Sequence, residues 1–220
     1  MPVTTVLIVE DHPIFSKGLA QLIGAQPGFE VVGEARNGAE ALSLLVAKEP
    51  SLVILDLNLG DEDGLSLIKD IKSRAPAAVI LVLSMHDERY YAERAIRSGA
   101  AGYIMKEAAG TKVLDAIRTV VSGGVWLSDA ERSRLEGYAA SPDAAAPDAD
   151  WLASISKLSD RQLQIFSLIG KGLGTVEIAA KLDLSTKTID THKEHNKAKL
   201  HCGSTQELRQ LAVEWTGRRQ

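Results

Sequence analysis

Three features are scarce or missing in this sequence. Cys202 is the only cysteine among the 220 residues, which excludes an internal disulfide and leaves Cys202 as an expected small packing residue. No run of about 18 apolar residues occurs, so no transmembrane helix is expected. Residues 1–5 lack a basic region followed by an apolar stretch, so no signal peptide is expected. These absences predict a soluble cytoplasmic protein that makes no membrane contact.

The small net charge of −4 conceals a marked asymmetry. Residues 1–150 carry 14 basic and 22 acidic side chains, whereas residues 151–220 carry 11 basic and 7 acidic ones. An acidic half joined to a basic half indicates that only the second half meets a polyanion.

The first 125 residues alternate short apolar runs with helical patterns. The runs of strand length are 5–9, 30–34, 52–56, 78–83 and 102–105. Helical patterns follow them at 13–23, 38–48, 64–73, 87–98 and 111–121. Five such units predict an α/β domain with a doubly wound five-stranded parallel sheet, whose ligand site lies at the carboxyl ends of the strands.

The remaining sequence divides into a linker and an all-α segment. Residues 139–148 are small, polar and marked by proline, which is typical of a linker. Beyond them, Ser159, Thr175, Ser185 and Ser204 are candidate N-caps of four short helices, with capping boxes at the first and the last. We therefore expect an N-terminal domain over 1–125, a linker over 126–153 and a four-helix domain over 154–220.

Polar side chains gather at the predicted strand ends of the first domain. Glu10 and Asp11 follow the first strand, Asp56 ends the third, Ser84 ends the fourth and Lys106 follows the fifth. Crowded carboxylates repel one another unless a cation neutralises them, and oxygen ligands favour Mg²⁺. A carboxylate can also attack a phosphoryl group to give an acyl phosphate. The pattern therefore predicts a Mg²⁺ site with phosphoryl chemistry.

These residues carry a family resemblance. Residues 4–122 resemble the flavodoxin-like receiver domain of two-component response regulators. The matching marks are Glu10-Asp11, Leu55-Asp56, Gly64, Leu83-Ser84, Gly99-Ala100-x-Gly102-Tyr103 and Met105-Lys106.

The resemblance implies a role for each residue of the acidic site. Asp56 would accept phosphate from a sensor histidine kinase. Asp11, Asp56 and the backbone carbonyl of Asn58 would hold Mg²⁺, with Glu10 in the outer shell, and Lys106 would pair with the phosphoryl oxygens.

The resemblance also implies a switch. Ser84 would hydrogen-bond a phosphoryl oxygen, and Tyr103 would turn inward as Ser84 moves. We further hypothesise that Asn58 and His86 border the path of the water that hydrolyses the acyl phosphate.

The helical segment carries a second resemblance. Residues 158–211 resemble the DNA-binding domain of the NarL/FixJ (LuxR-type) regulators. The matching residues are Leu158-Ser159-x-Arg161-Gln162, Gly172-Leu173, Glu177-Ile178-Ala179-x-x-Leu182, Ser185-x-Lys187-Thr188-Ile189-x-x-His192 and Lys199-Leu200. This implies a helix-turn-helix with a supporting helix over 175–182 and a recognition helix over 186–200.

The recognition helix supplies the candidate DNA contacts. Its lysines, including Lys199, suit phosphate contacts, whereas acidic residues occupy groove-facing positions where the family has basic ones. The candidate DNA-binding residues are Lys187, Thr188, Asp190, Thr191, Lys193, Glu194 and Lys197. Asn196 falls on the inward stripe where the family has an aliphatic residue, and His201 stands where glycine usually ends the helix.

Together the two resemblances imply a bacterial response regulator in which phosphorylation of Asp56 controls dimerisation, exposure of the recognition helix and binding to double-stranded promoter DNA. RNA polymerase is a further candidate partner. The dimer contact through the first and last receiver helices, or through the fourth helix and fifth strand, stays open. Two alternatives are a phosphohydrolase, disfavoured by Asn58 two residues after the nucleophile, and a protein-binding adaptor, favoured by Asp190 and Glu194.

Overall fold

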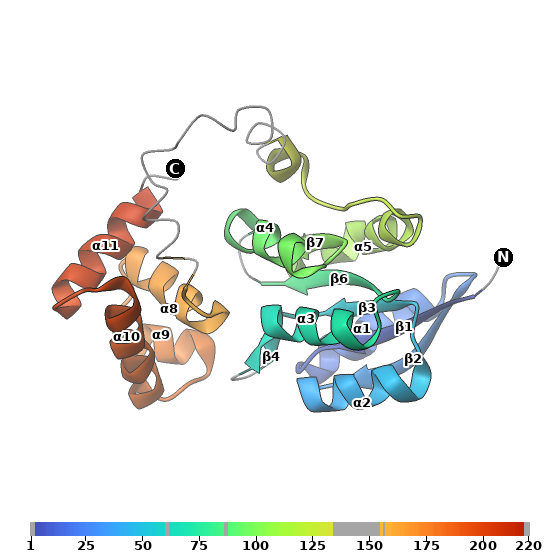
Figure 1. The fold of residues 1–220 in the computed structure, drawn as a ribbon, viewed down its shortest axis with the longest axis horizontal. Helices are drawn as coiled ribbons and strands as arrows, with labels where there is room; N and C mark the ends of the chain where they lie inside the picture. The colour runs from blue at the N-terminus through green and yellow to red at the C-terminus, as the bar shows by residue number, and fades with distance from the viewer. Residues whose placement is uncertain (1–2, 60–61, 86–87, 134–154, 156, 218–220) are drawn as a thin grey trace. The chain divides into compact units, whose positions relative to one another are not determined.

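The computed structural model describes residues 3–59, 62–85, 88–133, 155 and 157–217. The chain divides into two compact units, Met1–Pro142 and Asp143–Gln220. Figure 1 labels the helices and strands of both units.

The N-terminal unit is built on a five-stranded sheet. Its strands are β1 (Thr4–Val9), β2 (Phe29–Ala35), β3 (Leu52–Leu55), β6 (Val79–Ser84) and β7 (Gly102–Met105). They are all parallel and lie in the order β2-β1-β3-β6-β7. The central strands are almost entirely apolar and buried, as expected of a parallel sheet covered on both faces. The predicted doubly wound α/β architecture is confirmed.

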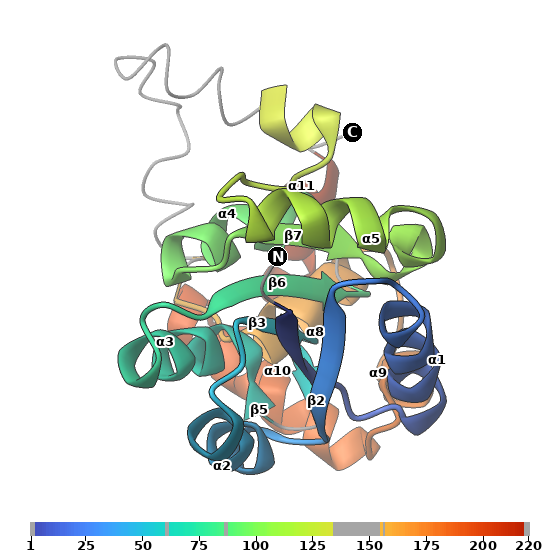
Figure 2. The same ribbon diagram turned by 90° about the vertical axis from the view of Figure 1, so that its right-hand side faces the viewer.

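Helices cover both faces of this sheet. They are α1 (Pro13–Gly24), α2 (Gly38–Lys48), α3 (Gly64–Arg74), α4 (Glu88–Ser98) and α5 (Lys106–Val121). One core joins α1 and α5 to Val6, Ile8, Leu81, Leu83 and Ile104 of the sheet. The other helices contact one another in the order α2, α3 and α4 on the opposite face (Figure 2).

Two details of this unit differ from the sequence prediction. Helix α5 begins at Lys106, five residues before the predicted start at Thr111, because Ala108 and Ala109 favour a helix and Ala109 is buried in the core. A small antiparallel hairpin, β4 (Asn58–Leu59) with β5 (Glu62–Asp63), was not predicted. The Glu62 carboxylate accepts a hydrogen bond from the N–H of Gly38 (2.6 Å), which joins this hairpin to the start of α2.

The segment that follows α5 returns to the sheet. Trp126 forms a parallel bridge with Gly102, its N–H donates to Ala101 O (3.1 Å), and its carbonyl accepts from the N–H of Tyr103 (2.9 Å). The N–H of Ser128 then donates to the Glu88 carboxylate at the start of α4 (2.8 Å). The first residues of the predicted linker therefore lie against β7 and α4, and most of that linker is outside the described residues.

The C-terminal unit is helical, as predicted. Its elements are α8 (Asp160–Gly170), α9 (Thr175–Leu182), α10 (Thr186–Leu200) and α11 (Thr205–Gly217). Phe166 and Trp215 pack in its core as a tilted aromatic pair, with ring centroids 5.6 Å apart. None of the helices in the described parts of the chain combines the length and the apolar character that crossing a bilayer requires.

The helix caps mostly follow the sequence. Ser159 and Gln162 form the predicted capping box of α8, and Ser185 caps α10. Helix α9 differs because its N-cap is Gly174, whose N–H donates to the Glu177 carboxylate (2.8 Å), while the Thr175 hydroxyl is engaged with α10.

At α11 the predicted box is shifted by one residue. The Ser204 hydroxyl accepts from the N–H of Glu207 (3.1 Å), whereas the Glu207 carboxylate accepts from Gly203 (2.7 Å). The Ser204–Glu207 spacing thus predicted the start of the helix correctly. It did not predict that the Glu207 carboxylate accepts from the N–H of Gly203 and not from that of Ser204.

Candidate functional site

The acidic residues of the N-terminal unit converge at the carboxyl ends of β1 and β3. Carboxylate oxygens of Glu10, Asp11 and Asp56, together with a ring nitrogen of His12, lie within 4.8 Å of one another. Glu10 and Asp56 are buried, whereas Asp11 is half-buried. Three carboxylates in so small a volume form a donor set that fits a hard divalent cation such as Mg²⁺.

Lys106 lies between two of these carboxylates. Its Nζ is 2.6 Å from Glu10 Oε2 and 2.7 Å from Asp56 Oδ2. The side chain is only 6% exposed, and its Nζ lies 4.7 Å from the centroid of the Phe15 ring. The residue that opens α5 therefore offsets part of the negative charge of the buried Glu10–Asp56 pair.

The pKa of Asp56 depends on opposing effects of its surroundings. Burial, assisted by the negative charge of Glu10, raises the pKa of Asp56 to about 6 against the lowering effects of Lys106 and of the Asn58 N–H. Burial alone would lower the pKa of Lys106, but the Asp56 and Glu10 carboxylates raise it above its ordinary value. At neutral pH the site therefore holds an ionised aspartate next to an ammonium group.

The loop after Asp56 is held close to this carboxylate. The N–H of Asn58 donates to Asp56 Oδ1 (3.0 Å). Gly64 packs where a Cβ would come within 2.5 Å of the Leu57 Cα, so only glycine fits at the start of α3. The Gly64 position of the motif is thus explained by backbone packing.

Ser84 and Tyr103 lie on one face of the sheet. Leu83 and Ile104 point toward α1 and α5, so the alternation of the strands directs Ser84 and Tyr103 to the opposite face. Both side chains are fully buried. In this structure the Tyr103 side chain therefore lies inward, on the same face of the sheet as Ser84.

Sequence reasoning missed two residues of this site. His12 Nδ1 lies 2.8 Å from Asp11 Oδ1 and 3.1 Å from Glu10 Oε1, and the His12 N–H also donates to Glu10 Oε1 (3.1 Å). The position of His12 directly after Glu10-Asp11 was a usable signal, but nothing in the sequence indicated the contact of Phe15 with Lys106. His86, predicted beside the hydrolytic water, lies outside the described residues.

Helix α10 of the C-terminal unit has an inward and an outward face. Ile189, Asn196 and Leu200 are buried against the rest of the domain. Of the predicted DNA-binding residues, Lys187, Asp190, Thr191 and Glu194 are exposed, whereas Thr188, Lys193 and Lys197 are partly buried.

The lysines of α10 have different partners. Lys193 Nζ donates to the Thr175 hydroxyl at the start of α9, and Lys197 Nζ donates to both oxygens of Glu194, each at 3.0 Å. Lys199 Nζ donates instead to Lys157 O (2.9 Å) and Gln162 Oε1 (2.7 Å). Lys199 therefore ties α10 to the start of α8 and is not presented to a phosphate.

The two residues that depart from the family pattern are both accommodated at a cost. Asn196 is fully buried, and its Nδ2 donates to Gln162 O (3.0 Å), but within the described residues its Oδ1 has no hydrogen-bond partner. His201 ends α10 in the left-handed conformation (φ 55°) that glycine adopts without strain. Cys202 next to it is half-buried, and burial raises the pKa of its thiol.

Comparison with known proteins decides the family. Residues 6–118 match the family described as response regulator receiver domain, and residues 156–212 match the one described as bacterial regulatory proteins, luxR family. The chain is a response regulator of the LuxR type. It belongs to a family of two-component transcription regulators with a helix-turn-helix DNA-binding domain, not to a family of enzymes.

Full-length relatives support this assignment. The response regulator is 33% identical over 213 residues to the oxygen regulatory protein NreC of Staphylococcus haemolyticus, covering 94% of this chain and 96% of that protein. It is similar to a structure of the RcsB response regulator from Salmonella typhimurium, concerned with DNA interaction (25% identity, 97% of this chain and 99% of the other, TM-score 0.57). Another similar structure shows two RcsB dimers bound to two parallel DNAs (25% identity, 96% and 98% coverage, TM-score 0.55).

Proposed function

We propose that Asp56 is the residue that a sensor histidine kinase phosphorylates. The observation that carries this proposal is the position of Asp56 at the end of β3, with Lys106 Nζ 2.7 Å from one oxygen. A carboxylate oxygen would attack the phosphorus of a phosphohistidine, so that an O–P bond forms as the P–N bond breaks and the imidazole leaves with the bonding electron pair. Lys106 would then pair with the phosphoryl oxygens.

The acidic site would hold Mg²⁺ during this transfer. Asp11, Asp56 and the Asn58 carbonyl would be ligands, with Glu10 in the outer shell. A bound Mg²⁺ supplies positive charge to the phosphoryl oxygens. The three converging carboxylates support this proposal.

Phosphorylation would act on the rest of the protein through Ser84 and Tyr103. Ser84 ends β6 immediately before the connection to α4, and Tyr103 lies on the same face of the sheet. A hydrogen bond from Ser84 to a phosphoryl oxygen would shift the equilibrium between the inactive and active conformations of the receiver toward the active one.

The active form would be a homodimer that binds double-stranded promoter DNA through the exposed side of α10. The dimers of the RcsB complex support this, because two-fold DNA half-sites favour two-fold proteins. The residues proposed to reach DNA are Lys187, Thr188, Asp190, Thr191, Lys193, Glu194 and Lys197. Once bound to a promoter, the protein would be able to contact RNA polymerase. Because DNA is the proposed ligand, we place the protein in the cytoplasm.

The test is phosphorylation by acetyl phosphate in the presence of Mg²⁺. We expect wild-type protein to gain one acid-stable, base-labile phosphate and to shift from monomer to dimer in light scattering. Asp56→Asn should gain none, whereas Asp70→Asn, on the exposed side of α3, should behave as wild type. Phosphate on Asp56→Asn, or none on wild type, contradicts the proposal.

A further inference from the structure

The outward face of α10 carries more acidic than basic charge. Opposite the buried stripe of Ile189, Asn196 and Leu200, the exposed side chains include Lys187, Asp190 and Glu194. An acidic side chain that enters a DNA groove is repelled by the phosphates unless a neighbouring cation offsets its charge. The surroundings of each acid therefore decide what it can do at the DNA.

Asp190 is engaged within the domain. Its carboxylate accepts a hydrogen bond from the Thr175 hydroxyl (3.5 Å) and lies 4.0 Å from Lys193 Nζ. Lys193, only 13% exposed, is itself bonded to Thr175 at the start of α9. Asp190 thus helps to join the two helices of the helix-turn-helix.

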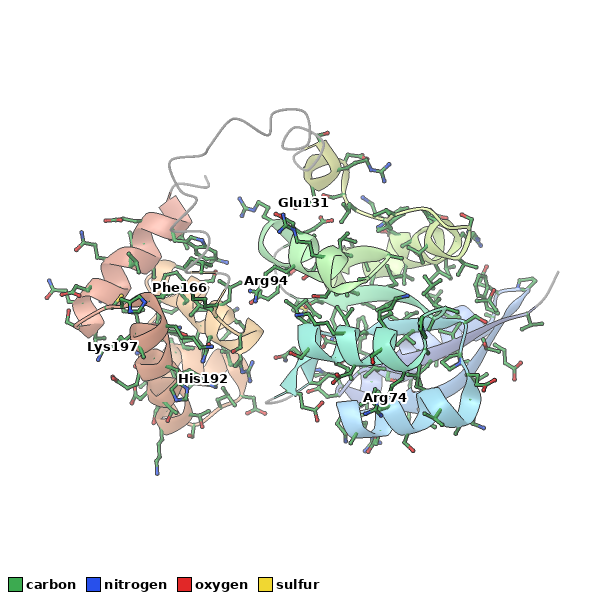
Figure 3. The ribbon with its side chains drawn as sticks, viewed as in Figure 1. Arg74, Arg94, Glu131, Phe166, His192 and Lys197 are labelled. Atoms are coloured by element: carbon green, nitrogen blue, oxygen red, sulfur yellow. The ribbon has the colours of Figure 1, made fainter. Side chains whose placement is uncertain are left out.

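Glu194 is placed differently. Both of its oxygens accept from Lys197 Nζ at 3.0 Å, and its side chain is 66% exposed. Lys197, labelled on α10 in Figure 3, is only 19% exposed, whereas the Glu194 side chain that it contacts stays 66% exposed, so the ion pair leaves the carboxylate accessible. The pair presents hydrogen-bond acceptors without net negative charge.

An acceptor of this kind distinguishes the bases of the major groove. Guanine shows two acceptors there and thymine shows one, and both repel a carboxylate. Adenine offers a donor beside the acceptor N7, whereas cytosine offers the N4 amino group alone. A carboxylate, which accepts only, matches cytosine best.

We propose that Glu194, neutralised by Lys197, is a base-reading residue that selects cytosine at one position of each half-site. This inference rests on the proposed binding of promoter DNA through α10. It predicts that replacing the cytosine at that position weakens binding by roughly ten- to hundredfold.

The test is selection from a random DNA library with the full-length protein, treated with acetyl phosphate and Mg²⁺. Wild-type protein should enrich a motif with a nearly invariant C at one half-site position. With Glu194→Gln that position should change to A, because an amide both donates and accepts, and with Glu194→Ala it should become degenerate. All other positions of the motif should stay the same.

Glu214→Gln is the matched control, since Glu214 is an exposed glutamate on α11 bonded to Gln210. Its motif should equal that of the wild type. A wild-type motif retained in both Glu194 variants overturns the assignment of Glu194 alone. Failure of wild-type protein to enrich any motif overturns it together with sequence-specific DNA binding by this chain.

Discussion

At the scale of single residues, burial and charge in the acidic site set the pKa of Asp56. Glu10 and Asp56 are buried carboxylates, and Lys106 contacts both. The balance of these charges leaves the pKa of Asp56 at about 6, raised chiefly by burial. The state of this one carboxyl group therefore changes within a pH range that is easily reached in solution.

Mg²⁺ affinity should depend on pH through Asp56. Above about pH 6 the Asp56 carboxylate is ionised, so the proposed metal would bind without displacing a proton from it, whereas below that pH a proton must be displaced. We expect the Kd for Mg²⁺ to be nearly constant at higher pH and to rise up to about tenfold for each pH unit below about 6. Calorimetric titrations from about pH 8 to about pH 5 would measure this. An unchanged Kd over that range contradicts it, and Asp56→Asn should abolish the dependence.

The strained end of α10 gives a second prediction. His201 adopts φ 55°, a conformation that costs a non-glycine residue about 1 kcal/mol or more. His201→Gly should therefore stabilise the C-terminal domain by about 1 kcal/mol, measured as the free energy of unfolding in urea. His195→Gly, in the middle of the same helix, should destabilise it by a similar amount. A loss of stability in His201→Gly would show that its side chain makes a compensating contact.

The sequence was most informative about residues at the ends of strands. The convergence of Glu10, Asp11, Asp56 and Lys106 could be predicted from the sequence alone, because carboxyl ends of parallel strands share one edge of the sheet. The hydrogen bond from Asn196 to Gln162 O could not be predicted, since it depends on how α10 packs on α8. Contacts fixed by packing between helices leave no periodic signal in the chain.

At the scale of helices and strands, close approach limits what can be substituted. A Cβ on Gly170, the last residue of α8, would lie 2.3 Å from Ala212 O and 2.8 Å from Ala212 C in α11. These are backbone atoms of a packed helix, so they cannot move away as the end of a side chain would. The close packing of α8 against α11 therefore depends on the absence of a side chain at this position.

Gly170→Ala should destabilise the C-terminal domain by about 1–3 kcal/mol, although alanine is the better helix former. Gly18→Ala is the matched control, because Gly18 lies in the middle of α1 with nothing within 4 Å of its Cβ position. That change should stabilise the receiver by about 0.5–1 kcal/mol. Thermal unfolding of the full chain would measure both, and equal shifts of one sign would contradict the packing argument.

The sequence patterns did not predict the start of α5 or the short strands β4 and β5. The start of α5 was expected at Thr111, yet the helix begins at Lys106, and Gly110 lies inside it with no atom near its Cβ position. The two-residue strands β4 and β5 are too short to show alternation. Helix α5 and the hairpin both lie next to the acidic site, and each makes a contact distant in sequence, through Lys106 with Glu10 and Asp56 and through Glu62 with Gly38.

At the scale of the whole molecule, charge separates the two halves. The acidic receiver half and the basic DNA-binding half have opposite net charge, so we expect contacts with DNA phosphates in the second half. Lys187, exposed in the first turn of α10, is the basic residue of its outward face.

The salt dependence of DNA binding should show that the C-terminal half makes the phosphate contacts. Binding of the phosphorylated protein to DNA should weaken linearly in a plot of log K against log salt, and Lys187→Gln should reduce the slope by about 0.9. Lys112→Gln, an exposed change on α5 of the receiver, should leave the slope unaltered. Titrations by fluorescence anisotropy at several salt concentrations would measure it. Equal slopes for wild type and Lys187→Gln would remove Lys187 from the phosphate contacts.

The attachment of Trp126 to β7 has a mechanical consequence. The main chain of Trp126 is bonded to the residues on either side of Gly102, one of which is Tyr103. The segment that follows α5 is therefore bonded directly to the strand that carries Tyr103. A displacement of β7 would carry the main chain of Trp126 with it, so a movement of this strand would reach the first residues of the predicted linker through two hydrogen bonds.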